Sequence, residues 1–157
     1  MKLTPEIVSE SSVATAENGY VVTMTTPIDV KVVRNLLCCA FEGGYTDYWI
    51  GDIRVGTLPE GTVAADFKLG GSMQDPKNYW HPHQLVPTTE GGSLRIHDYE
   101  MEAWYTLDKA AIERGLAKIS NCPGLAHHWS NVMLDNADAE TGDVFIQCCI
   151  HGEVVYG

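Results

Sequence analysis

Apolar residues recur with helical spacing in four segments of the chain. The first segment follows "TPID", where Thr26 is the expected N-cap and Pro27 the first helical residue. Its apolar positions keep the period of about 3.6 residues that places them on one face of a helix. They are Ile28, Val32, Val33, Leu36, Leu37 and Ala40. Glycines 43 and 44 are expected to end this helix, because glycine adopts the left-handed C-cap conformation without strain.

The other three helical segments lie in the second half of the chain. "TLDKAAIERGLAKI" predicts a helix with Thr106 as its N-cap, and "GLAHHWSNVML" predicts a short helix over 124–134. Asp138 is the expected N-cap of "AETGDVFIQCCIH". Each segment has an apolar face, so we expect all of these helices to pack on a common core.

Alternation of apolar and polar residues predicts the strands. Residues 6–26 alternate loosely around Asn18–Gly19, a pair that favours a β-hairpin turn. Segments 48–55, 62–69 and 93–100 are also expected to be strands, with "EVVYG" as a tail strand. The segment 70–92 is rich in Gly, Pro and aromatic residues, which is typical of a long binding loop.

These elements predict an α+β fold in a single globular domain covering residues 1–157. We expect a mainly antiparallel sheet with about three to four helices on one side. The hairpin of about residues 6–26 is expected at the periphery of the domain.

Charge and cysteine content narrow the classes of partner. The chain has 10 basic and 21 acidic residues, a net charge of −11, which argues against binding polymeric DNA or RNA. Four of its five cysteines form the adjacent pairs 38–39 and 148–149, without the spacing of a zinc site. No apolar run is long enough for a membrane span, and the N-terminus lacks a signal-peptide core. We therefore expect a cytoplasmic protein with reduced thiols, no metal, no cofactor and no membrane partner.

The first candidate binding cluster follows the first helix. Gly43 and Gly44 would let a ligand approach the backbone, and Tyr48 and Trp49 would offer faces on which a base could stack. The alternative is that Gly43 only caps the helix and the aromatic residues belong to a strand. Glu42 raises a separate question, because a carboxylate at a helix C-terminus is disfavoured by roughly 0.3–1 kcal/mol. Either an arginine offsets its charge or the carboxylate accepts hydrogen bonds from a ligand.

Two further clusters complete the candidate binding site. Trp80 and His81 lie in the long loop and could close over a ligand. In the last helical segment, Asp143 and Gln147 are four residues apart and share a face. The remaining candidates are the N-terminal pair of the last helix, where backbone N–H groups gather, and a strand arginine that could bind phosphate. These residues are Asp138, Thr141 and Arg95.

Four motifs carry a resemblance to a known family. The motifs are "AFEGG…YW", "GGSLRIHD", "TLDKAAIERGL" and "AHHW…DNADAETGDVFIQCCIHGEVVYG". Together they resemble a family of small bacteriophage and prophage proteins over most of residues 32–157. The resemblance implies a phage origin, and small acidic phage proteins often counter host immunity by sequestering or cleaving nucleotide signals.

The leading hypothesis is a non-enzymatic phage protein that captures a small nucleotide signal in the host cytoplasm, as a homo-oligomer. Two alternatives remain open. One is a phosphodiesterase that uses a histidine as general acid or base, chosen from His81, His97, His127 and His128. The other is an acidic inhibitor that docks on a host enzyme.

Overall fold

The computed structural model describes residues 10–67 and 81–157, and over these ranges it confirms the α+β prediction. Every strand pair is antiparallel: β1 (Glu10–Ala16) pairs with β2 (Gly19–Thr25), and β3 (Ile50–Thr57), β4 (Ser93–Asp98) and β5 (Ala103–Leu107) form a separate sheet. The five helices of the described residues exceed the expected three to four. They are α1 (Val30–Glu42), α2 (Pro82–Thr88), α3 (Lys109–Asn121), α4 (Ala126–Met133) and α5 (Ala139–His151).

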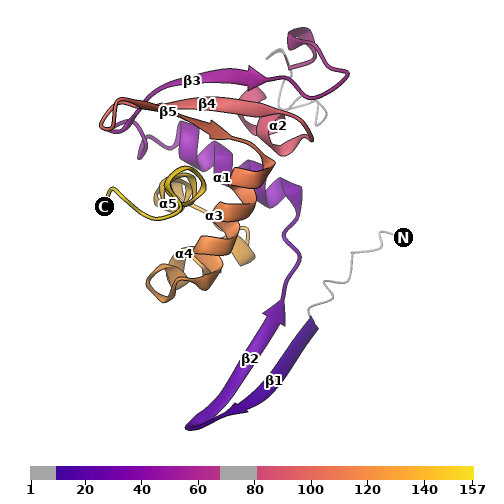
Figure 1. Cartoon of the computed structure of the whole chain (residues 1–157), viewed down its shortest axis with the longest axis vertical. Helices are drawn as coiled ribbons and strands as arrows, with labels where there is room; N and C mark the ends of the chain where they lie inside the picture. The colour runs from indigo at the N-terminus through magenta and orange to yellow at the C-terminus, as the bar shows by residue number, and fades with distance from the viewer. Residues whose placement is uncertain (1–9, 68–80) are drawn as a thin grey trace.

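The three-stranded sheet has one buried and one exposed face. Along β4, Leu94, Ile96 and Asp98 are buried, whereas Arg95 between them is exposed. Helices α1, α3 and α5 lie on the buried side, which confirms the prediction that the helices pack on one side of the sheet (Figure 1). The opposite face of the sheet, which we call the outer face, is free of these helices.

Helix α5 is the centre of the core. All ten residues from position 141 to position 150 are buried, including the polar side chains of Asp143 and Gln147. Helices α1 and α3 both pack against α5. The contact with α1 depends on two glycines, because a Cβ at Gly43 would lie 2.5 Å from the Ala139 Cβ and one at Gly142 would lie 2.4 Å from the Ala40 backbone nitrogen. Gly43 therefore serves helix packing.

Two helix starts and one helix end differ from the prediction. Asp29, not Thr26, caps α1, and its carboxylate accepts a hydrogen bond from the Lys31 backbone nitrogen at 2.8 Å. Asp108, not Thr106, caps α3 in the same way, with the Ala111 nitrogen at 2.9 Å. Aspartate is at least as good an N-cap as threonine, so the nearby aspartate is used in both cases. At the end of α1, Gly43 stays right-handed and Gly44 takes the left-handed conformation.

Other segments also differ from the predicted pattern. The expected strand 62–69 is replaced over residues 64–67 by the 3₁₀ helix Ala64–Phe67, where the Asp66 carboxylate accepts a hydrogen bond from the Val63 nitrogen at 2.8 Å. Residues 68 and 69 of the expected strand lie outside the described residues. The tail after Gly152 forms no strand. Strand β5 was not expected, and helix α2 forms within the segment 70–92 that was expected to be a loop.

The β1–β2 hairpin extends away from the rest of the described chain (Figure 1). Every residue from 11 to 25 is exposed. Over residues 10–25 the expected hairpin is therefore present at a peripheral position, and residues 6–9 of that prediction lie outside the described residues. None of the described helices combines the length and apolar character needed to cross a bilayer.

Candidate functional site

A cavity of about 820 Å³ lies beside α5, the segment after α1 and the C-terminal tail. Three tyrosines contribute to its wall, and we call it the tyrosine cavity. Its lining residues are Gly44, Tyr45, Asp47, Tyr48, Leu125, His128, Glu140, Asp143, Val144, Val154, Tyr156 and Gly157. Segments that are about a hundred residues apart in the sequence therefore meet at one cavity.

Asp143 is the buried carboxylate of the tyrosine cavity. One of its oxygens, Oδ1, accepts a hydrogen bond from Trp49 Nε1 at 2.8 Å, and Oδ2 accepts one from the Tyr48 hydroxyl at 3.4 Å. Burial raises the pKa of Asp143, and the hydrogen bonds from Trp49, Gln147 and Tyr48 oppose this effect. A carboxylate offers about four acceptor positions, so Asp143 retains capacity for a donor in the cavity.

The two aromatic residues after α1 have different positions. Tyr48 is 44% exposed and lines the tyrosine cavity, so its ring is accessible to a ligand. Trp49 is completely buried, which excludes the expected stacking of a base on its ring in this structure. Its indole instead holds Asp143 and packs against His151 and Tyr156.

Gln147 anchors the C-terminal tail. Its Oε1 accepts hydrogen bonds from the backbone nitrogens of Val155 and Tyr156 at 2.9 and 2.7 Å, and its Nε2 donates to the Tyr156 carbonyl oxygen at 3.1 Å. Gln147 is fully buried, so the expected contact with the edge of a base is replaced by this structural role. The Gln147 amide thus forms hydrogen bonds with the tail backbone of the kind that a neighbouring strand would otherwise form.

Tyr156 connects the tyrosine cavity to a buried polar cluster. Its hydroxyl donates to Asp98 Oδ2 at 2.8 Å, and His151 Nε2 lies 3.1 Å from the same oxygen. Asp98 is completely buried, and the geometry at His151 Nε2 is too poor for a hydrogen bond despite the short distance. Burial and the Asp98 hydrogen bond raise the pKa of Tyr156 to about 12. Sequence reasoning did not identify Tyr156, because the tail has no periodicity to mark it.

The N-terminus of α5 is occupied by its own side chains. Asp138 caps the helix by accepting a hydrogen bond from the Thr141 nitrogen at 2.8 Å, which lowers the pKa of Asp138. The Thr141 hydroxyl is buried and lies 2.9 Å from both His128 Nδ1 and Asn131 Nδ2. Of these residues, His128 lines the tyrosine cavity, whereas Asp138 and Thr141 hold the helix start. Among the four histidines considered for catalysis, His128 alone is in the lining.

The lining of the tyrosine cavity is acidic. Of the residues that the structure describes, Asp47, Glu140 and Asp143 lie in this lining, but neither lysine nor arginine does. A phosphate in this cavity would face three carboxylates with only His128 to offset them. The cavity therefore suits neutral or cationic groups that donate hydrogen bonds.

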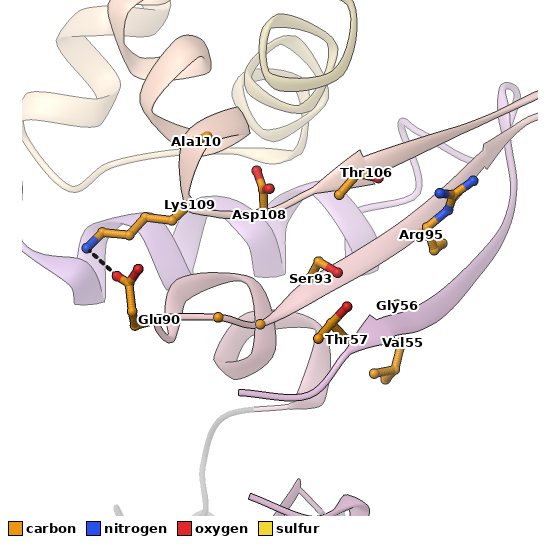
Figure 2. A pocket seen from close by; sticks show the side chains of 12 residues that line it. Val55, Gly56, Thr57, Glu90, Ser93, Arg95, Thr106, Asp108, Lys109 and Ala110 are labelled. Atoms are coloured by element: carbon orange, nitrogen blue, oxygen red, sulfur yellow. Dashed lines mark hydrogen bonds and ion pairs between the residues drawn. The ribbon is translucent and has the colours of Figure 1, made fainter. Parts of the chain in front are cut away.

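The remaining candidates lie elsewhere or outside the described residues. Glu42 Oε1 is 3.3 Å from His81 Nε2, so a histidine, not an arginine, is beside this terminal carboxylate. His81 is the N-cap of α2, and Trp80 lies outside the described residues. Arg95 is exposed on β4 and lines a different hollow of about 790 Å³, which we call the polar hollow (Figure 2). The structure thus brings Gly44, Tyr48 and Asp143 together in the lining of the tyrosine cavity, whereas Glu42, His81 and Arg95 lie outside this lining.

Comparison with known proteins gives no match: no family model, no curated protein and no solved structure is significantly similar to this chain.

Proposed function

We propose that the protein binds a small ligand in the tyrosine cavity through a flat ring that carries N–H groups, as a nucleobase does. Asp143 is the observation that carries the proposal. Its carboxylate is buried, is held in place by Trp49 and Tyr48, and keeps free acceptor capacity beside accessible tyrosine rings. Stacking on an aromatic side chain contributes about 1–3 kcal/mol per base, and a charge-assisted hydrogen bond adds specificity.

The size of the cavity supports a ligand of this class. Its volume of about 820 Å³ falls within the usual range for small-molecule sites, and several apolar side chains complete its wall. The absence of lysine and arginine from this lining implies that any phosphates of the ligand lie outside the cavity. The polar recognition is thus directed at the base end of a nucleotide.

The resemblance to phage proteins gives this binding a biological setting. In the proposed function, a phage protein captures a nucleotide immune signal, such as a cyclic dinucleotide or an ADP-ribose derivative, in the cytoplasm of the host. Capture without conversion is proposed because His128, the histidine in the lining, already interacts with Thr141 through Nδ1. Incubation followed by denaturation of the protein should return the ligand intact, whereas fragments would indicate a phosphodiesterase.

Calorimetry tests the binding proposal. Nucleosides, cyclic dinucleotides and cyclic ADP-ribose are titrated into the wild type and into Asp143→Asn, which keeps the shape but loses the charge. We expect one of these ligands to bind clearly and to lose at least tenfold in affinity in the variant, about 1.4 kcal/mol. Tyr99→Phe, at an exposed position outside this lining, is the control and should bind normally. If no base-bearing ligand binds more tightly than about millimolar, the proposal is wrong.

A cationic amine is the second candidate ligand. Three tyrosines and three carboxylates in one lining resemble the environment that favours ammonium groups. Adding spermidine and tetramethylammonium to the same calorimetric panel distinguishes the two classes. Binding of the amines but of no nucleoside would favour this candidate.

We also propose that copies of the chain associate through the hairpin. The register pairs Val13 with Val22 and Ser11 with Met24, so Val13, Tyr20, Val22 and Met24 share one face. These four side chains are 57–77% exposed. A two-stranded hairpin is marginal by itself in water, and a second copy would cover this face.

A further inference from the structure

The outer face of the three-stranded sheet carries two arginines directly opposite each other. Arg54 on β3 pairs with Arg95 on β4 in the strand register, and both are exposed. Like charges in this position destabilise a sheet, because the facing Cβ atoms are only about 5 Å apart. The chain has 10 basic and 21 acidic residues, so a carboxylate opposite each arginine would be the expected arrangement.

Only one of the two guanidinium groups has a partner among the described residues. Arg54 Nε donates to Asp52 Oδ2 at 2.7 Å, and its guanidinium carbon lies 5.0 Å from the centre of the Trp104 ring. Arg95 makes no hydrogen bond or ion pair with any residue of 10–67 or 81–157. The repulsion between the two arginines is therefore not relieved at Arg95 by the described part of the chain.

The carboxylates around this face are already engaged. Asp52 is paired with Arg54, and Glu90 Oε2 is 3.0 Å from Lys109 Nζ, as the dashed line in Figure 2 shows. Asp108 caps α3 through its hydrogen bond with the Ala111 nitrogen. Each of these three carboxylates thus has another partner, and Arg95 retains its full donor capacity.

Arg95 lines two hollows of the surface. A hollow of about 270 Å³, the arginine hollow, is lined by Arg54, Val55, Arg95 and Trp104. Arg95 also lines the polar hollow with the hydroxyl-bearing Ser93 and Thr106 (Figure 2). Gly56 keeps this region accessible, because a Cβ there would lie 2.7 Å from Ser93 Oγ and 3.2 Å from Arg95 Cγ.

We propose that Arg54 and Arg95 bind an oxyanion, the phosphate or carboxylate group of a small ligand, on the outer face of the sheet. A guanidinium group forms paired, charge-assisted hydrogen bonds with such groups. An anion between the two arginines turns their repulsion into a shared attraction, and the hydroxyls of Ser93 and Thr106 provide neighbouring donors. This site is independent of the tyrosine cavity, because the two share no lining residue.

The test uses inorganic pyrophosphate and citrate as probes of the two sources of oxyanion. Each is titrated into ¹⁵N-labelled full-length protein at constant ionic strength, and the indole N–H signal of Trp104, assigned with Trp104→Phe, is followed. We expect a saturable shift in the wild type and at least tenfold weaker binding in Arg95→Gln. Lys31→Gln removes the same charge from an exposed position on α1 and should bind as the wild type does.

A stability measurement keeps the test decisive if the signal of Trp104 is broad. Pyrophosphate that binds the folded protein raises the melting temperature, and this increase should disappear in Arg95→Gln but persist in Lys31→Gln. A response to pyrophosphate alone identifies a phosphate ligand, one to citrate alone a carboxylate, and a response to both supports the shared oxyanion chemistry. No saturable response, or equal responses in wild type and Arg95→Gln, would overturn the proposal.

Discussion

At the scale of single residues, Asp143 combines a cost to stability with a role in the proposed binding. Burial raises its pKa, so ionisation of this carboxylate disfavours the folded state. A group with a raised pKa in the folded state stabilises the fold while it is protonated, and this contribution is lost as the pH rises through that pKa. Asparagine would keep an acceptor for Trp49 Nε1 without this penalty.

Asp143→Asn is therefore expected to keep or gain stability at neutral pH while losing the ligand. The free energy of unfolding should stay within about 1 kcal/mol of the wild type or increase. Urea denaturation at neutral and mildly acidic pH measures this, and the advantage of the variant should shrink as the pH falls. A large loss of stability at neutral pH would mean that the charged carboxylate serves the fold and not a ligand.

Tyr156→Phe tests a tyrosine that supplies a hydrogen bond to a buried carboxyl group. The substitution leaves the buried Asp98 without the 2.8 Å hydrogen bond from the Tyr156 hydroxyl, at an expected cost of about 1–3 kcal/mol at neutral pH. Because the pKa of Tyr156 is raised to about 12, its contribution is complete below the ordinary tyrosine value of about 10 and is lost as the pH rises toward 12.

Denaturation curves between neutral and alkaline pH measure both effects. The wild type should lose stability more steeply than Tyr156→Phe above about pH 10, since only the wild type has this group to ionise. Tyr99→Phe, at an exposed position, should follow the wild type. Equal alkaline slopes in wild type and Tyr156→Phe would contradict the assigned hydrogen bond.

The sequence predicts which of these residues lie close together more accurately than it predicts the role of each residue. Grouping Tyr48 and Trp49 with Asp143 anticipates residues that lie in contact. Their burial depends on tertiary packing, and local spacing does not distinguish the exposed Tyr48 from the buried Trp49. Tyr156 could not be predicted, because its position depends on the bonds between Gln147 and the tail backbone.

At the scale of elements, long periodic segments were predictable and short ones were not. Helix α1 has a clear apolar period, although it is capped by Asp29 and not by the expected Thr26. Helix α5 has the expected N-cap Asp138, and the hairpin has its turn residues. Strand β5 has Trp104 and Tyr105 on opposite faces, which hides the alternation of apolar and polar residues. Helix α2 has seven residues and an internal Pro87, too short and too irregular for a helical period.

The crossing of α1 and α5 provides a prediction at this scale. Gly142→Ala would place a Cβ 2.4 Å from the Ala40 nitrogen and 2.7 Å from the Cys39 carbonyl carbon, so the helices must separate. We expect a loss of about 1–3 kcal/mol or more in thermal or urea unfolding. Gly124→Ala is the matched control, because no atom lies within 4 Å of its Cβ position, and its effect should be within about 0.5 kcal/mol. Equal effects of the two substitutions would contradict the close packing.

At the scale of the whole molecule, the distribution of charge bears on self-association. A net charge of −11 opposes contact between two copies over most of the surface. Residues 11–25 contain Glu17 as their single charged residue, so two hairpins can meet with little repulsion. Adjacent residues of a strand point to opposite sides, so the apolar side chains lie on one face of the hairpin. The contact between copies is therefore expected on that face.

Val21 and Val22 make this expectation testable. They are adjacent on β2 and similarly exposed, at 53% and 57%, yet Val22 lies on the face with Val13, Tyr20 and Met24, whereas Val21 lies on the opposite one. Val22→Lys should therefore reduce the mass measured by light scattering to that of a single chain, while Val21→Lys, with the same new charge, should leave the assembly intact. Both variants should keep the melting temperature of the α+β core, because every residue from 11 to 25 is exposed. A wild type that is monomeric at all concentrations, or equal masses for the two variants, would refute association through this face, and the ligand titrations would then concern a monomeric receptor.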